Sequence, residues 1–188
     1  MNEERNRRPD NHRLFYALWP GTALRRALAD ATGEALSGVT GNRVPASNLH
    51  VTLAFLGAVP GRALAGLIAV GGRGPWPLVE LDFARVEYWP RPRVLVAVPA
   101  VVPLTGAEIA DRLWSALEPK GFTREKRRWT AHLTLMRKLS RPPPRDFAPA
   151  IPRRPERDAA DWRLALVESE TLPEGPRYRP LADWPLGH

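Results

Sequence analysis

The sequence contains one short motif twice, as His50-Val51-Thr52-Leu53 and as His132-Leu133-Thr134-Leu135. The chain has only four histidines, so half of them share one local context. Each motif lies in a short apolar stretch, and the first is bounded by Pro45 and Gly57, which is typical of a β-strand. Side chains alternate between the faces of a strand, so each His points to the same side as the Thr two residues later. If both strands line one cleft, its floor holds two imidazoles and two hydroxyls.

Two imidazoles and two hydroxyls suit the cleavage of a phosphodiester without a metal ion. In-line attack at phosphorus needs a base that takes a proton from the nucleophile and an acid that protonates the leaving oxygen. Histidine can do either, because its ordinary pKa is about 6.5. The hydroxyls of Thr52 and Thr134 can donate to the phosphate oxygens that gain charge in the transition state. The motifs therefore predict His50 and His132 as an acid and base pair.

A structural role for each motif is the competing interpretation. A single His on a half-buried strand is more often structural than catalytic, and Thr is a good strand former. The duplication, the shared Leu and the small number of histidines favour the catalytic interpretation. His12 and His188 have no such context, and we expect both to be surface residues near the chain ends.

The two motifs also belong to an ordered set of segments that extends from Arg13 to about Leu186. In chain order the segments are residues 13–20, 48–57, 89–95, 132–137 and 166–169, followed by Gly175 and Tyr178. On these segments the chain resembles the two-histidine phosphoesterases, and within them the RNA 2′,3′-cyclic phosphodiesterases, also called 2′-5′ RNA ligases. Two positions differ from the usual family pattern, because Ala131 stands in place of Pro and Val96 in place of an aromatic residue. Neither difference removes a proposed chemical group.

The resemblance implies a hydrolase that opens a terminal 2′,3′-cyclic phosphate of RNA to a 2′-phosphomonoester, with O3′ as the leaving group. By motif position, His50 would be the general acid and His132 the general base that activates water. Thr52 and Thr134 would hold the phosphate oxygens, and no cofactor or metal is implied. From the residues themselves, a symmetric pair does not reveal which His is the acid.

Two residues that follow the motif threonines are candidate substrate contacts. The resemblance implies that Phe55 stacks on the terminal base, because aromatic stacking binds single-stranded RNA without demanding a sequence. Phe55 shares the strand parity of Leu53, however, so a core position is an equal alternative. Arg137 lies on the opposite face from His132 by strict alternation. It would reach the phosphate only if the strand bends or ends there, and a solvated strand end is the alternative.

A basic segment precedes the second motif and leads into it through Trp129. It contains Arg124, Lys126, Arg127 and Arg128, and we expect it to face RNA rather than bulk solvent, with Arg128 as a substrate contact. Trp129 is the one tryptophan that we consider a candidate for base stacking. The others are expected in the core or between lobes: Trp19, Trp76, Trp89, Trp114, Trp162 and Trp184.

The composition narrows the class of protein. The 188-residue chain has a formal net charge of +8 and a pI near 10.9, which suggests a polyanionic partner such as RNA. Biased codon usage is the alternative, because all but three of the 28 basic residues are arginine. The chain has no cysteine, which excludes disulfides and cysteine-based metal sites. It also lacks a long apolar run and a signal-type start, so we expect a cytoplasmic protein without a membrane partner, and a monomer by default.

The order of apolar patterns predicts a two-lobed α+β fold. We expect residues 1–11 to form a flexible tail and residues 12–188 a single bilobed catalytic domain. The order of strand, helix and motif strand occurs twice, which indicates a pseudo-symmetric duplication, with antiparallel sheets lining a central cleft and helices on the outer faces. A capping box is predicted at Thr105 and Glu108. We expect strands at 13–19, 49–57, 78–88, 93–98, 131–137, 162–169 and 177–181, helices at 22–36, 62–70 and 105–117, and a proline-rich loop at 140–155.

Two other functions use the same residues. A 2′-5′ RNA ligase would run the reaction in reverse, although water would normally compete with the RNA nucleophile. A non-catalytic protein that binds RNA ends would grip phosphate in the cleft, and its affinity would fall steeply with salt. The intact acid and base pair favours the phosphodiesterase.

Overall fold

The computed structural model describes residues 11–144, 147, 149, 151, 161–173 and 175–187. Two four-stranded sheets form its framework. Sheet A has the strand order β3-β1-β7-β8, with β1 (Asn11–Pro20), β3 (Val51–Pro60), β7 (Trp162–Leu172) and β8 (Gly175–Pro185). Sheet B has the order β2-β6-β5-β4, with β2 (Asn42–Arg43), β4 (Phe83–Trp89), β5 (Val94–Pro99) and β6 (Leu133–Arg137). Every pair of neighbouring strands is antiparallel. The predicted α+β class is therefore confirmed.

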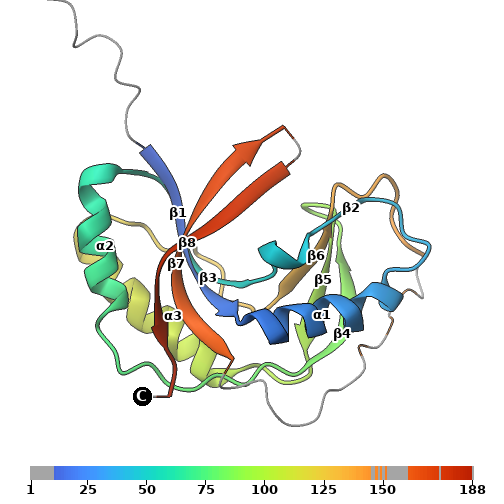
Figure 1. Cartoon of the computed structure of the whole chain (residues 1–188), viewed down its shortest axis with the longest axis horizontal. Coiled ribbons are helices and arrows are strands. Elements are labelled where there is room, and N and C mark those ends of the chain that lie inside the picture. The colour runs from blue at the N-terminus through green and yellow to red at the C-terminus, as the bar shows by residue number, and fades with distance from the viewer. Residues whose placement is uncertain are drawn as a thin grey trace, which may run out of the picture.

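Three α-helices and three short 3₁₀ helices connect the strands of the described residues. The α-helices are α1 (Thr22–Ala35), α2 (Leu64–Gly71) and α3 (Leu104–Leu117). The 3₁₀ helices are η2 (Ala46–Asn48), η3 (Gly61–Ala63) and η4 (Glu118–Lys120). Figure 1 shows sheet A with α2 and α3 on one side of the molecule and sheet B on the other.

The two sheets repeat one connection, in which a strand leads through a helix to an antiparallel motif strand. In sheet A the unit is β1-α1-β3, and in sheet B it is β5-α3-β6. The helix of the second unit crosses to the other sheet, because α3 packs against β3. The two lobes are thus pseudo-symmetric but interlocked, which agrees with the expected duplication.

Alternation along β1 shows how the sequence divides the interior. Leu14, Tyr16 and Leu18 point to one face and are fully buried in the main core, which spans both sheets. Phe15, Ala17 and Trp19 point to the other face and form a second cluster with residues of β7. On sheet B, β5 contributes a third cluster of Val94, Val96 and Val98. The second and third clusters support the cleft floor, so each sheet is apolar on both faces, as expected for strands that read as continuous apolar runs.

Several predicted element limits are wrong for identifiable reasons. The segment at 78–82 is not a strand, although Val79 and Leu81 are buried on one side of it. The alternating pattern reflects burial on one side of the segment, without hydrogen bonds to a neighbouring strand. The strand begins only at Phe83. The predicted capping box is also absent. Pro103 in an extended conformation precedes the helix, which starts at Leu104 and places Thr105 inside its first turn.

The chain ends also differ from expectation. Strand β1 begins at Asn11, so the last residue of the expected tail belongs to the sheet, whereas residues 1–10 and His188 lie outside the described residues. His12 is only partly exposed, because its Nδ1 lies 2.6 Å from Oε1 of Glu168. In the expected loop at 140–155, the backbone of Pro149 and of Ile151 bonds to β4. Much of that loop otherwise lies outside the described residues.

Candidate active site

A cleft of about 620 Å³ lies between the two sheets and contains both motifs. His50 and Thr52 enter it from the start of β3, and His132 and Thr134 enter it from the start of β6. Each His is the residue immediately before its strand. The structure therefore brings together the four residues that the duplicated motif singled out.

The two histidines are oriented by the same backbone contact. Nδ1 of His50 lies 2.7 Å from the carbonyl oxygen of Asn48, and Nδ1 of His132 lies 2.9 Å from that of Thr130. A carbonyl oxygen only accepts hydrogen bonds, so Nδ1 must carry a proton in both rings. In the neutral tautomer, Nε2 then presents its lone pair and can act as a base. In the cation, Nε2 carries a proton and can act as an acid.

Aromatic side chains enclose His50 more tightly than His132. The ring of His50 lies 4.9 Å from Phe15, 5.8 Å from Trp19 and 5.0 Å from Tyr178, measured between ring centroids. His132 has one aromatic contact among the described residues, with the ring of Trp89 at 4.6 Å. His50 is buried, whereas His132 is half-buried. The two imidazoles thus share one orientation but differ in access to solvent.

Burial and positive charge lower the pKa of both imidazoles, so both are neutral near pH 7. Burial lowers the pKa of His50 to about 4, although the hydrogen bond with Asn48 opposes the shift, and the charges of Arg137 and His132 lower it further. Burial also lowers the pKa of His132, again against a hydrogen bond from the backbone, and Arg137 contributes in the same direction. Because His132 affects the pKa of His50, the two rings are electrostatically coupled. Near neutral pH, both Nε2 atoms are therefore proton acceptors.

A bulge in β3 turns Phe55 toward the cleft. Thr52 pairs with Ala17, but the next pair along the ladder joins Ala54 to Tyr16, so Leu53 is the extra residue. The extra residue reverses the alternation, and Phe55 lies on the same face as Thr52. Phe55 lines the cleft with 38% of its surface exposed. The core position that strict alternation allowed is therefore wrong.

The same bulge occurs in β6. Thr134 pairs with Val96 and Met136 pairs with the adjacent Leu95, so Leu135 is the extra residue. Arg137 therefore lies on the same face as Thr134 and lines the cleft. The strand bend that Arg137 needed in order to reach the cleft is thus present. In both motifs, the residue three places after Thr becomes a cleft residue for the same structural reason.

Arginines surround the mouth of the cleft. Arg91 comes from the turn between β4 and β5, and Arg124, Arg127 and Arg128 come from the loop before the second motif. Acidic residues compensate part of this charge, because Arg124 pairs with Asp111 and Arg127 lies 3.7 Å from Glu125. Three of the four residues of the basic segment thus line the cleft, and Arg128 is one of the exposed ones.

Two tryptophans near the second motif line the cleft. Trp89, expected in the core or between lobes, packs against the third cluster on β5 and contacts the ring of His132 in the cleft between the two sheets. Trp129, the candidate for base stacking, is half-buried and donates its indole N–H to the backbone oxygen of Thr52 at 2.8 Å. Trp76, Trp114 and Trp162 are buried in the main core as predicted.

Asn48 and Tyr178 support His50 in a way that sequence analysis missed. The side-chain amide of Asn48 donates to the oxygen of Pro176 and accepts from the backbone N–H of Tyr178. This pair of bonds attaches the start of β8 to the segment before the first motif, and it places the ring of Tyr178 edge-on to His50. The residues are 130 positions apart, so no local pattern could have revealed the contact.

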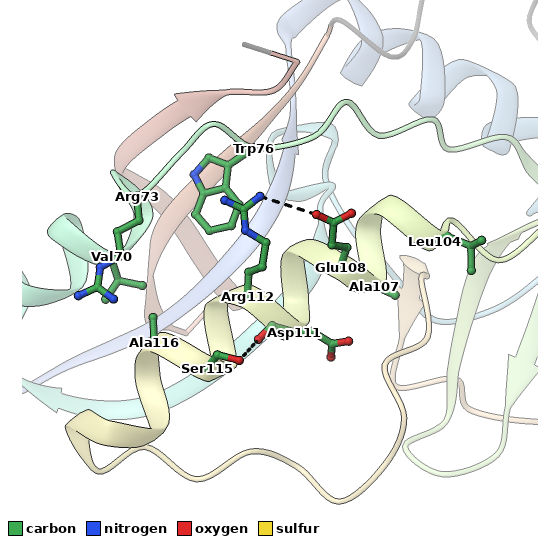
Figure 2. A pocket seen from close by; sticks show the side chains of 10 residues that line it. All are labelled: Val70, Arg73, Trp76, Leu104, Ala107, Glu108, Asp111, Arg112, Ser115 and Ala116. Atoms are coloured by element: carbon green, nitrogen blue, oxygen red, sulfur yellow. Dashed lines mark hydrogen bonds and ion pairs between the residues drawn. The ribbon is translucent and has the colours of Figure 1, made fainter.

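A second hollow of about 580 Å³ lies between α2 and α3, away from both motifs (Figure 2). Arg112 stacks over the ring of Trp76 at 4.5 Å and lies 3.8 Å from Glu108, as the dashed line in Figure 2 marks. Its lining contains no histidine and no His-x-Thr motif. The motif cleft is therefore the better candidate for the active site.

Neither a cluster of metal ligands nor a membrane-spanning helix occurs among the described residues. No group of three or more His, Asp or Glu side chains is arranged as metal ligands in this part of the chain. No helix within the same residues is long and apolar enough to cross a membrane.

Known proteins resemble the chain over nearly its whole length, although no family model matches it. RNA 2′,3′-cyclic phosphodiesterase of Escherichia coli K12 is 28% identical over 183 residues, which cover 93% of this chain and 96% of that protein. RNA 2′,3′-cyclic phosphodiesterase of Archaeoglobus fulgidus is 31% identical over 177 residues, which cover 90% and 97%. The crystal structure of E. coli LigT with 3′-AMP has a TM-score of 0.75 at 27% identity, covering 95% of this chain and 99% of LigT. TT0787 of Thermus thermophilus gives a TM-score of 0.76 at 27% identity, covering 94% and 100%.

Two sheets that each bring a His-x-Thr motif to one cleft define a two-histidine phosphoesterase. Given the 31% identity with the archaeal relative over 97% of its length, the chain belongs to the RNA 2′,3′-cyclic phosphodiesterase family. The family that the sequence motifs indicated is thus confirmed.

Proposed function

We propose that the protein hydrolyses a terminal 2′,3′-cyclic phosphate of RNA to a 2′-phosphomonoester. The observation that carries this proposal is the matched orientation of His50 and His132, whose Nε2 atoms face one cleft while a backbone carbonyl holds each Nδ1. The names of its curated relatives add support. No cofactor or metal has a role in the proposed reaction.

The proposed reaction is an in-line displacement at phosphorus. His132 takes a proton from water through Nε2, and the water oxygen forms a bond to phosphorus. The bond from phosphorus to O3′ breaks on the opposite side, and His50 gives a proton from Nε2 to O3′. The products are a 2′-phosphomonoester and a free 3′-hydroxyl. The hydroxyls of Thr52 and Thr134 donate to the two non-bridging oxygens, where negative charge builds.

Solvent access supports this division of roles. His132 is the more exposed imidazole, so water can reach its Nε2. His50 is enclosed by three aromatic rings, which keep bulk water from the leaving-group side. His50 must gain a proton before it can act as an acid, because burial lowers its pKa to about 4. The negative charge of the bound phosphate favours that protonation.

The residues around the pair are proposed as substrate contacts. Arg137 supplies positive charge beside the phosphate, and Phe55 offers a ring face at the cleft mouth for the terminal base. The guanidinium of Arg13 lies 4.9 Å from the centre of the Phe55 ring and supports it. The exposed Arg128 is proposed to meet the RNA backbone. We also propose that the enzyme acts as a monomer in the cytoplasm.

The test is incubation with an RNA oligonucleotide that ends in a 2′,3′-cyclic phosphate, in buffer with EDTA. Product identification by ³¹P NMR separates the 2′-phosphate from the 3′-phosphate. We expect His50→Ala and His132→Ala to lose roughly 10²-fold to 10⁴-fold in kcat. Thr52→Val and Thr134→Val keep the side-chain shape and should each lose roughly 10²-fold.

The matched control is His12→Ala, because His12 lies outside the cleft lining and pairs with Glu168 instead. This variant should retain wild-type turnover. Intact substrate with the wild-type protein would refute the proposed hydrolysis and favour the binding function. Joining of a 5′-hydroxyl RNA to the cyclic end, in preference to hydrolysis, would favour the ligase.

A further inference from the structure

We propose that Trp129 is a positioning residue that fixes the distance between the two motif strands, and this inference rests on the proposed function. Trp129 precedes His132 by three residues and therefore belongs to the sheet B side of the cleft. Its side chain, however, contacts the backbone of the first motif in sheet A. One side chain thus connects the segments that carry the two halves of the catalytic pair.

The first contact is a hydrogen bond across the cleft floor. The indole N–H of Trp129 donates to the backbone oxygen of Thr52 at 2.8 Å. Strand β3 is the outer strand of sheet A, so one edge of its backbone has no neighbouring strand. Thr52 also lies directly before the bulge at Leu53. The bond therefore holds β3 next to one of the bulges in its pairing with β1.

The second contact holds the six-membered ring of the Trp129 indole against helix α3. A Cβ atom added at Gly106 would lie 2.7 Å from Cη2 and 3.2 Å from Cζ3 of Trp129. Gly106 is buried in the first turn of α3, and α3 packs against β3. The six-membered ring thus lies close against a helix backbone that only glycine leaves open. Contact at Gly106 and the bond to Thr52 together define the position of the ring.

The distance between the strands matters because the acid and base act on opposite sides of one phosphorus atom. Each motif belongs to a different sheet, so no backbone ladder links Thr52 to Thr134. A displacement of about 1 Å can cost roughly 10²-fold in rate when reacting groups must align. Trp129 provides a direct bond between the two sides at the motif itself.

Base stacking, the role expected from the sequence, makes the opposite prediction for one substitution. Trp129→Phe keeps an aromatic face but removes the indole N–H. If Trp129 stacks on a base, the Phe ring can replace it, and only removal of the aromatic ring would raise KM. If Trp129 positions the strands through its N–H, Trp129→Phe removes the bond and lowers kcat. The same substitution also removes Cη2 and Cζ3, the atoms that a side chain at Gly106 would meet.

The experiment is a double-mutant cycle with Trp129→Phe, Gly106→Ala and the combined variant. A short RNA with a 2′,3′-cyclic phosphate end is the substrate, and the affinity for inorganic phosphate is measured in parallel. We expect each single variant to lower kcat roughly 10-fold to 100-fold, with KM changed by less than about twofold. Gly106→Ala should cost nothing further in the Trp129→Phe background, because the shorter ring leaves room for the methyl group.

Three outcomes would overturn the inference. Full kcat in Trp129→Phe at an unchanged melting temperature, with KM raised only when the aromatic ring is removed, would leave only the stacking role. Additive losses in the combined variant would show that Gly106 acts separately from Trp129. A lower melting temperature with unchanged kcat, measured where the variants are folded, would show a merely structural role. If the wild-type protein does not hydrolyse the RNA, the proposed function fails, but the same cycle in phosphate affinity still tests the link between the strands.

Discussion

Saturating sulfate should move a proton onto His50. Burial lowers the pKa of His50 from 6.5 to about 4. At about 1.4 kcal/mol for each tenfold change, that difference corresponds to roughly 3 kcal/mol against the charged imidazole. At pH 7 only about one His50 ring in a thousand is then protonated, which leaves the proposed general acid without its proton.

A bound anion can offset this cost. Two unit charges about 4 Å apart attract by about 4 kcal/mol at an effective dielectric constant of about 20. An anion held between Thr52 and Thr134 would therefore return the pKa of His50 to its ordinary value or above it. Since binding then takes up a proton, sulfate affinity should fall by up to about tenfold per pH unit between the pKa of His50 in the free protein and its raised pKa in the complex, and should level off above that.

The assay is an NMR titration of the imidazole Cε1–H signals, from about pH 4.5 to 8, with and without sulfate. Sulfate suits this range because its own charge does not change there. The chain has only four histidines, so the signals can be resolved, and His50→Gln assigns one of them. His12 is an internal control, because it lies outside the cleft lining and should not respond to sulfate.

The reasoning is refuted if sulfate binds in the cleft and the pKa of His50 does not rise. If the proton goes to His132 instead, the roles of acid and base are exchanged. A rise in both pKa values with uptake of a single proton would show that the coupled pair shares it.

Three further predictions follow from single contacts. Arg137→Gln should raise the pKa of both His50 and His132 in the free protein, because the Arg137 charge lowers both, and NMR titration would contradict this if neither value moved. Gly71→Ala should destabilise the fold by about 1–3 kcal/mol in chemical unfolding, since the new Cβ would lie 2.2 Å from the Trp184 ring. Gly66→Ala in the same helix is its control and should be neutral or stabilising, because the nearest atom there is 3.9 Å away. Finally, the stability of the wild-type protein should decline between about pH 6.5 and 4. Over that window the unfolded state binds more protons at His50, whose folded pKa is depressed, and the His50→Gln variant should lack this part of the decline.

The sequence predicted the secondary structure best where residue patterns report local hydrogen bonding. Helix α3 and the strands around both motifs lie within a few residues of their expected limits. The segment at 78–82 shows where such reasoning fails, because one-sided burial of Val79 and Leu81 mimics a strand without a partner. The Thr105 capping box fails for a similar reason, since the pattern was present but Pro103 starts the helix one residue earlier.

The candidate site likewise contains residues that the sequence predicted and residues whose place it left undecided. His50, Thr52, His132 and Thr134 could be selected from the sequence because the motif is short, duplicated and chemically specific. Strict alternation leaves Phe55 between two positions and places Arg137 on the opposite face from His132, because it does not account for a bulge. A bulge depends on how a strand pairs with its neighbour, and pairing joins residues far apart in the chain.

Local motifs and apolar periodicity were sufficient to predict the α+β class and the four residues His50, Thr52, His132 and Thr134, and resemblance over the ordered segments indicated the family. The electrostatic surroundings of the two histidines follow from the three-dimensional packing alone. Burial among Phe15, Trp19 and Tyr178 lowers the pKa of His50, and Trp129 reaches across to the backbone of Thr52. Such effects depend on distance in space, and packing between segments more than a hundred residues apart sets the surroundings of His50.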